Sequence, residues 1–328
     1  MKQLISIIGP TATGKTSLAL AIAKQLLKNK EYEGIELISA DSRQVYQGLS
    51  IITGADVPAN FQETKAKADY PYFQHNSKKI NLHGVAVIKP NQEWSVAHFK
   101  KLALQIIQEA WQKQHLAIVV GGTGLYHQHL FSKSNYFGIP ANKELRNKAE
   151  KMKLPELQEW LKKINQEKFN QLNRSDKNNP RRLIRRIEIE LFVKNSQAKI
   201  KAKDKFKPDS QLLIGLQNKL ANIKEKIKQR VKQRWQSGAK KEVKAIIRKY
   251  PNEKLPALSA TGVKEISQFL RNEITEKECL NLWTLREYQY AKRQITWWKK
   301  RPGINWLDLS QKNFKKNAFQ LVSDYLEQ

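Results

Sequence analysis

The stretch Gly9-Pro10-Thr11-Ala12-Thr13-Gly14-Lys15-Thr16 decides the fold of this chain. It fits the pattern G-x-x-x-x-G-K-[ST] and lies between an apolar run, residues 4–8, and a helical pattern that follows it. Strand, loop and helix in this order are typical of a phosphate-binding loop, where backbone N–H groups and the positive end of the helix face an anion. Lys15 would add a point charge, and Thr16 a hydroxyl for Mg2+. The stretch therefore predicts a site for two linked phosphates, but it does not say whose phosphates they are.

The composition favours a polyanionic partner. The chain has 328 residues, and 60 Lys and Arg stand against 30 acidic residues, a formal net charge of +30. Such an excess favours nucleic acid over acidic proteins. No apolar run approaches membrane-spanning length, and a single cysteine, Cys279, excludes an internal disulfide. Because the sequence opens on a core strand without a targeting peptide, we expect a cytoplasmic protein.

Residues 1–135 alternate between strand and helix patterns. The apolar runs 4–8, 35–40 and 116–120 are short and do not alternate, as in a buried parallel sheet, and residues 95–112 have helical spacing. This pattern predicts a doubly wound α/β domain, whose ligands bind beyond the carboxyl ends of the strands. Residues 41–44 and 121–124 should therefore share one rim with the phosphate loop.

Residues 137–212 read as long, charged helices. A turn-rich stretch, residues 173–180, precedes a helix on which Arg181, Arg182, Arg185 and Arg186 crowd one face. An arginine face of this kind is either solvated or makes forked contacts to phosphates. We expect an insertion that closes over a nucleic acid.

The chain then returns to the first domain with a strand at residues 212–216 and a further helix. On that helix Arg230 and Arg234 lie on or beside the apolar stripe. Either both snorkel to its edge, or Arg230 meets the phosphates held by Lys15. Residues 283–306 interleave aromatic and basic residues, which suits either RNA stacking or a core.

Taken in order, these motifs resemble the tRNA dimethylallyltransferase family, and they span most of the chain. The matching pieces are Gly9-Pro-Thr-Ala-Thr-Gly-Lys-Thr16, Ile38-Ser-Ala-Asp-Ser-Arg-Gln-Val-Tyr46, Trp94-Ser-Val-Ala-His-Phe99, Val120-Gly-Gly-Thr-Gly-Leu-Tyr126, Asn178-Asn-Pro-Arg-Arg-Leu-Ile-Arg185, Gln229-Arg230 with Gly238 and Glu242-Val243, and Ala291-Lys-Arg-Gln-Ile-Thr-Trp297.

The resemblance implies an α/β fold, a P-loop NTPase-like parallel-sheet core with an inserted helical domain. Residues 1–135 and 213–328 would form the catalytic core, and residues 136–212 would grip tRNA. The expected reaction transfers a dimethylallyl group from dimethylallyl diphosphate to N6 of adenosine 37, beside the anticodon in the tRNA stem-loop, and releases pyrophosphate. The protein would use Mg2+ and act as a monomer.

The same match gives the site residues. Asp41 is the expected base, although an Asp in a phosphate-loop protein often coordinates magnesium instead. Lys15, Thr16, Arg230 and magnesium, the last held by Thr16, would stabilise the departing pyrophosphate. The loop residues Gly9, Pro10, Thr11, Ala12, Thr13, Gly14, Lys15 and Thr16 would bind the diphosphate. The residues expected along the tRNA are Asp41, Ser42, Arg43, Gln44, Thr123, Arg146, Arg181, Arg182, Leu183, Ile184 and Arg185.

The chain departs from the family pattern in places, and two other functions remain open. After Tyr46 the family usually has Asp-Ile-Gly-Thr-Ala-Lys-Pro, whereas this chain reads Ser50-Ile-Ile-Thr-Gly-Ala-Asp-Val-Pro58; Leu220, Lys226 and Val263 also depart from it. A small-molecule or nucleoside kinase would bind ATP at the same loop, but the strand ending at Val120 leads into Gly-Gly instead of an acidic residue. An RNA-binding protein with a degenerate nucleotide site would tolerate Asp41→Ala.

Overall fold

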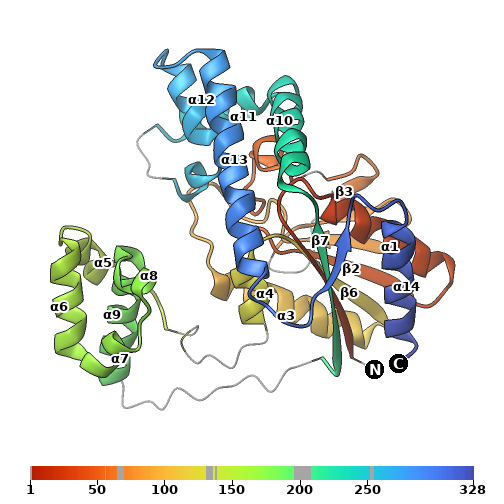
Figure 1. Cartoon of the computed structure of the whole chain (residues 1–328), viewed down its shortest axis with the longest axis horizontal. Coiled ribbons are helices and arrows are strands. Elements are labelled where there is room, and N and C mark those ends of the chain that lie inside the picture. The colour runs from red at the N-terminus through yellow and green to blue at the C-terminus, as the bar shows by residue number, and fades with distance from the viewer. Residues whose placement is uncertain are drawn as a thin grey trace. The chain divides into compact units, whose positions relative to one another are not determined.

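The computed structural model describes residues 2–55, 57–64, 70–130, 136, 139–195, 208–251 and 255–328. The chain divides into two compact units (Figure 1). Unit 1 comprises Met1–Phe131 and Lys207–Gln328, and unit 2 is Ser132–Phe206. The expected domain boundary at residues 135/136 and the expected start of the insertion at residue 137 involve positions outside the described residues.

The described residues of unit 1 form an eight-stranded sheet in the order β3-β4-β5-β2-β6-β1-β7-β8. Its strands are β1 (Gln3–Ile8), β2 (Gly34–Ser39), β3 (Phe61–Thr64), β4 (Tyr72–His75), β5 (Ile80–His83), β6 (His115–Val120), β7 (Ser210–Gln217) and β8 (Asn305–Asp308). The pairs from β5 to β8 are parallel, while β3 and β4 pair antiparallel. Every residue of β1 and β2 is buried, which explains why Ile and Leu occupy both faces of each strand. The fold is therefore mixed α/β with a mostly parallel sheet, as predicted.

The antiparallel edge of the sheet was not predicted from the sequence. β3 and β4 have four residues each and mix polar with aromatic side chains, so neither contains an apolar run. Their order comes from pairing: Phe61 lies opposite His75, and Phe73 opposite Leu82 of β5. Such contacts between segments are not visible in local periodicity.

The helices of unit 1 fall into two groups, seen in Figure 1. Around the sheet are α1 (Lys15–Lys28), α3 (Val96–Gln112), α4 (Gly124–Leu130) and α14 (Phe314–Leu326), while the short α2 (Ser50–Thr53) shares the core of the second group through Ile52. The second group is α10 (Leu220–Gln236), α11 (Ala239–Lys249), α12 (Val263–Leu270) and α13 (Glu276–Trp298), with a 3-10 turn at Pro256–Ser259. Ser95 caps α3 as predicted, accepting the His98 N–H.

Each group of helices has its own apolar core. α1 and α14 pack on the sheet through residues such as Leu18, Ile22 and Val322. The second group buries Ile223, Ile227, Val231 and Trp283 together. Trp283 and Trp298 are 0% and 3% exposed, so these two tryptophans of the basic, aromatic tail belong to the core.

Unit 2 is a helical bundle of α5 (Lys143–Ala149), α6 (Leu154–Ile164), α7 (Gln166–Asn170), α8 (Arg174–Lys177) and α9 (Pro180–Asn195). Leu157, Leu161, Leu183 and Ile187 form its core. The stretch predicted as turns contains the short helix α8, because Asn173 caps it by accepting the Asp176 N–H at 2.9 Å.

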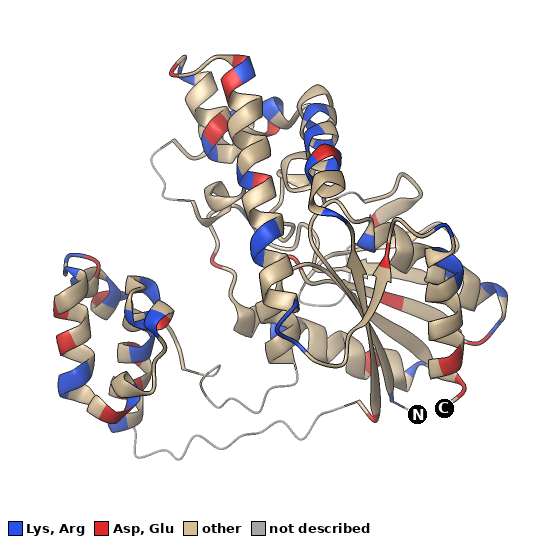
Figure 2. Cartoon of the chain, viewed as in Figure 1, with Lys and Arg blue, Asp and Glu red and all other residues tan. Residues whose placement is uncertain are grey.

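Positive charge is distributed over both units, and Figure 2 shows a dense run of it along α10. In the described ranges, no helix combines the length and apolar character needed to cross a bilayer.

Candidate active site

The phosphate loop joins β1 to α1 and has the backbone that its sequence predicts. Gly9 has φ 141°, and a Cβ there would lie 2.6 Å from the carbonyl oxygen of Leu216 on β7. Gly14, with φ 77°, is the N-cap residue immediately before α1. Both positions therefore favour glycine. Thr13 closes the loop by donating its hydroxyl to the carbonyl of Pro10 at 2.7 Å.

Lys15 lies inside the loop, where burial and a neighbouring cation disfavour its positive charge. Its Nζ donates to the Pro10 carbonyl at 2.7 Å. Burial, and then the charge of Arg230, lower the pKa of Lys15 to about 8, although Asp41 partly opposes this. An anion bound here would relieve the same unfavourable environment.

A cavity of about 540 Å³ opens beside the loop, entirely within unit 1. Several site residues predicted from separate parts of the chain line it together: Thr11, Ala12, Gly14, Lys15, Thr16, Asp41, Gln44 and Arg230. Gly9, Pro10 and Thr13 complete the loop without lining the cavity. Thr53, Gly54, Val57 and Pro58 form another part of the wall, so the stretch that departs from the family pattern contributes to the site.

Asp41 follows the carboxyl end of β2, where the sequence predicts ligand contacts. Its Oδ1 accepts the backbone N–H of Arg43 at 2.8 Å, which fixes the orientation of the carboxylate. Among the described residues, no cluster of three or more His, Cys, Asp or Glu could hold a metal ion. Thr16 and Asp41 line this cavity, and hydroxyl and carboxylate oxygens are donors of the kind Mg2+ prefers.

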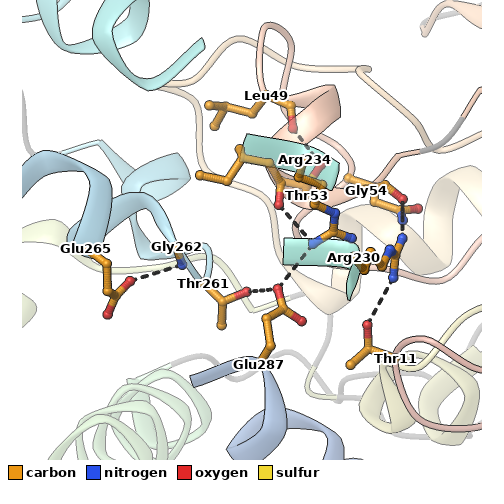
Figure 3. Close-up of polar contacts among 12 residues, drawn as sticks. Thr11, Leu49, Thr53, Gly54, Arg230, Arg234, Thr261, Gly262, Glu265 and Glu287 are labelled. Carbon is orange, nitrogen blue, oxygen red and sulfur yellow. Dashed lines mark hydrogen bonds and ion pairs between the residues drawn. The ribbon is translucent and has the colours of Figure 1, made fainter. Parts of the chain in front are cut away.

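Arg230 reaches the cavity from α10. Its Nη1 donates to Thr11 Oγ1 at 3.2 Å and its Nη2 to the Gly54 carbonyl at 3.3 Å (Figure 3). Arg230 therefore contacts the phosphate loop, and its contact with bound phosphates stays a prediction. Lys226, one turn earlier, also lines the cavity, although the sequence marks it only as a departure.

Two residues of α13 at the site were not predicted. Gln294 lines the cavity and accepts the Thr11 N–H through Oε1 at 2.8 Å. Tyr290 hydrogen-bonds to the Thr123 side chain, and burial, followed by the charge of Asp41, raises the pKa of its phenol. The helical motif at residues 291–297 was the only sequence signal near them, and it gave neither residue a role.

The other residues predicted to contact tRNA near Asp41 are Ser42, Arg43, Gln44 and Thr123, of which Gln44 also lines the cavity. The backbone N–H of Ser42 donates to Thr123 Oγ1 at 3.3 Å. Arg43 Nη1 donates to Ser259 Oγ at 2.5 Å, while Gln44 Nε2 donates to the Gly54 carbonyl at 2.8 Å. They form a continuous rim next to the carboxylate.

The remaining predicted tRNA contacts belong to unit 2. Arg146 and Arg185 both pair with Glu188, at 2.7 and 3.0 Å, and Arg182 pairs with Asp176. Arg181 is exposed. Leu183 and Ile184 are 0% and 8% exposed, so their side chains belong to the core of unit 2 and do not form a surface for RNA. The family motif marks this turn of helix without distinguishing its buried face.

Comparisons with known proteins agree with this geometry. A family model described as IPP transferase matches residues 44–301, and one described as Isopentenyl transferase matches residues 2–70. The chain is 33% identical to the tRNA dimethylallyltransferase of Halothermothrix orenii, covering 95% of this chain and 89% of that protein. It is 32% identical to the protein of the same name from Dictyoglomus turgidum, with 96% and 90% covered.

Solved structures show the same fold. The tRNA isopentenylpyrophosphate transferase of Bacillus halodurans superposes with a TM-score of 0.66 at 26% identity, covering all of this chain and 97% of that one. A eukaryotic dimethylallyltransferase acting on tRNA gives a TM-score of 0.74 at 23% identity, with 100% and 80% covered, and supports the fold alone. The chain therefore belongs to the IPP transferase family.

Proposed function

We propose that this protein is a tRNA dimethylallyltransferase that transfers the dimethylallyl group of dimethylallyl diphosphate to N6 of adenosine 37 and releases pyrophosphate. One observation carries the proposal: a phosphate loop, a strand-end carboxylate and a cation from α10 line the same cavity. This arrangement suits a diphosphate leaving group on one side and a base on the other.

The loop would hold the diphosphate of the donor. Backbone N–H groups at the start of α1, together with Lys15 and Arg230, offer positive charge to the leaving oxygens. Negative charge on those oxygens grows as the C–O bond breaks, so these contacts become stronger in the transition state than in the ground state.

Asp41 would act as the base. As N6 attacks the allylic carbon, the C–O bond to the diphosphate breaks, and the carboxylate accepts a proton from the amine. The hydrogen bond from the Arg43 N–H holds one carboxylate oxygen and leaves the other for this task.

The donor set of the cavity fits magnesium. Thr16 would hold the ion, with oxygen atoms of the diphosphate among its other ligands. Bound there, magnesium would neutralise charge on the diphosphate.

Unit 2 would bind the tRNA as the RNA-gripping domain. Its exposed Arg181 and the net charge of +30 support binding to phosphates. The adenine would leave its stack to enter the cavity, which suits a reaction at the edge of a base. A tRNA substrate supports a cytoplasmic location, and action as a monomer stays a prediction.

Incubation with unmodified tRNA and one labelled donor tests the function. We expect label in tRNA from allyl-labelled dimethylallyl diphosphate and none from γ-labelled ATP. Phosphorylation from ATP would favour the kinase alternative, and binding of tRNA without transfer from either donor would favour a non-catalytic RNA-binding protein.

A further inference from the structure

A buried ion pair joins α10 to α13 behind the proposed diphosphate site. Arg234 Nη1 lies 3.3 Å from Glu287 Oε1, and the two side chains are only 7% and 8% exposed. Glu287 also accepts the Thr261 hydroxyl at 2.6 Å (Figure 3). Since a buried charge is costly without a partner, neither member of the pair can be lost alone without a large effect.

Arg234 also contacts the wall of the cavity. Its Nη1 donates to the Ile52 carbonyl at 3.3 Å, and two residues later the Gly54 carbonyl accepts Arg230 Nη2 at the same distance. Two arginines one turn apart on α10 therefore hold the carbonyl of Ile52 in α2 and that of Gly54 at its C-terminal end. From the other side Glu242 accepts the N–H groups of Ile51 and Ile52, each at 3.0 Å.

Gly54 makes this arrangement possible. It has φ 62°, and a Cβ there would lie 1.8 Å from Arg234 Nη2 and 2.3 Å from Arg230 Nη2. The two guanidinium groups thus pack against the same glycine, where their like charges repel. Glu287 offsets that repulsion on the side away from the cavity.

Only one of the two arginines faces the cavity: Arg230 lines it and Arg234 does not. We propose that Arg234, held by Glu287, is a positioning residue that sets the Arg230 guanidinium and the Thr53–Gly54 wall for diphosphate binding. It touches no substrate and acts through Arg230. This inference rests on the proposed function of the cavity.

If the pair of Arg234 and Glu287 served only the stability of the fold, removing it would leave the affinity for pyrophosphate unchanged. Replacing a buried pair with apolar residues of similar size is often neutral for stability or even increases it. The double variant Arg234→Met/Glu287→Leu can therefore keep the fold while it removes the contact to Ile52. A structural role predicts unchanged ligand affinity in that variant, and a positioning role predicts a loss.

The experiment measures binding of inorganic pyrophosphate, with magnesium, to the full chain by calorimetry, beside thermal melting and tRNA affinity. We expect the double variant to bind pyrophosphate about tenfold more weakly, about 1.4 kcal/mol, at unchanged tRNA affinity. The matched control is Arg271→Met/Glu273→Leu, which removes an exposed ion pair of unit 1, and it should bind as the wild type does.

Equal pyrophosphate affinity in the double variant and the wild type would overturn the proposal. If the double variant fails to fold, Arg234→Lys serves, because it keeps the charge opposite Glu287 but lacks the fork that reaches Ile52. Its affinity should fall at least threefold, and wild-type affinity would again overturn the inference. Wild-type protein that binds pyrophosphate but transfers no allyl group would contradict the proposed function alone, and failure of the wild type to bind pyrophosphate would contradict both.

Discussion

Gln294 on α13 accepts the backbone N–H of Thr11 in the phosphate loop at 2.8 Å. The Gln294 side chain is 5% exposed, and a Cβ at Gly122 would lie 2.0 Å from its Nε2. A helix near the end of the chain therefore fixes the shape of a loop near its beginning.

Gln294→Leu should weaken diphosphate binding. The substitution leaves the Thr11 N–H without this acceptor, at a cost of about 1–3 kcal/mol, so the affinity for pyrophosphate should fall at least fivefold. Calorimetry measures it, with Gln289→Leu, an exposed position on the same helix, as the control. Unchanged affinity would show that the loop keeps its shape without this bond.

Arg230→Met should raise the donor KM more than it lowers the affinity for tRNA. The guanidinium lines the cavity, and losing one charge-assisted contact to a phosphate costs about 1.5–3 kcal/mol. Steady-state transfer assays over a range of dimethylallyl diphosphate concentrations measure the change. Lys228→Met removes an exposed charge from the same helix outside the cavity and should leave KM unaltered. Equal effects of both variants would indicate only a loss of general positive charge.

Arg181→Ala should weaken tRNA binding while the donor KM stays the same. Each lost phosphate contact lowers the slope of log affinity against log salt by about 1. Binding titrations at several salt concentrations measure that slope, and Lys316→Ala, an exposed site on α14, is the control. A normal salt slope in Arg181→Ala would exclude this face from RNA contact.

By contrast, Leu183→Ala should destabilise unit 2 by about 2–5 kcal/mol because it opens a cavity in the core.

Acid should weaken the sheet through Glu36. Burial would raise the pKa of this carboxyl, but hydrogen bonds from His115, His83 and Asn81 outweigh it and hold the pKa well below its ordinary value of 4.5. Because the pKa is depressed in the folded state, the stabilisation is present above the unfolded pKa and is lost as the pH falls below it. Urea unfolding from neutral pH to about 3 should show a steeper loss in the wild type than in Glu36→Gln. Parallel curves would contradict the role of this carboxylate.

The sequence predicts those features that local pattern or topology determines. The strands containing Ile5, Ile38 and Val119 are buried on both faces and therefore read as apolar runs, and parallel topology then brings Asp41 to the phosphate loop. The family assigned from the ordered motifs is confirmed by the comparisons.

Contacts between distant segments could not be predicted in this way. Gln294 and Thr11 are 283 positions apart, and neither has a local signal for the other. Leu183 is buried in the core of unit 2, and the linear motif that places it along the tRNA does not say which residues of a helix face a core.

The central claim is that Asp41 serves the chemistry at a cavity that binds diphosphate independently of it. Single-turnover transfer of labelled dimethylallyl to tRNA by Asp41→Asn tests it most directly, with pyrophosphate and tRNA affinities measured on the same protein and Asp324→Asn, an exposed aspartate, as the control. We predict a rate about 100- to 10,000-fold below wild type, with tRNA affinity kept and pyrophosphate still bound without magnesium. A rate within a few fold of wild type would contradict the account.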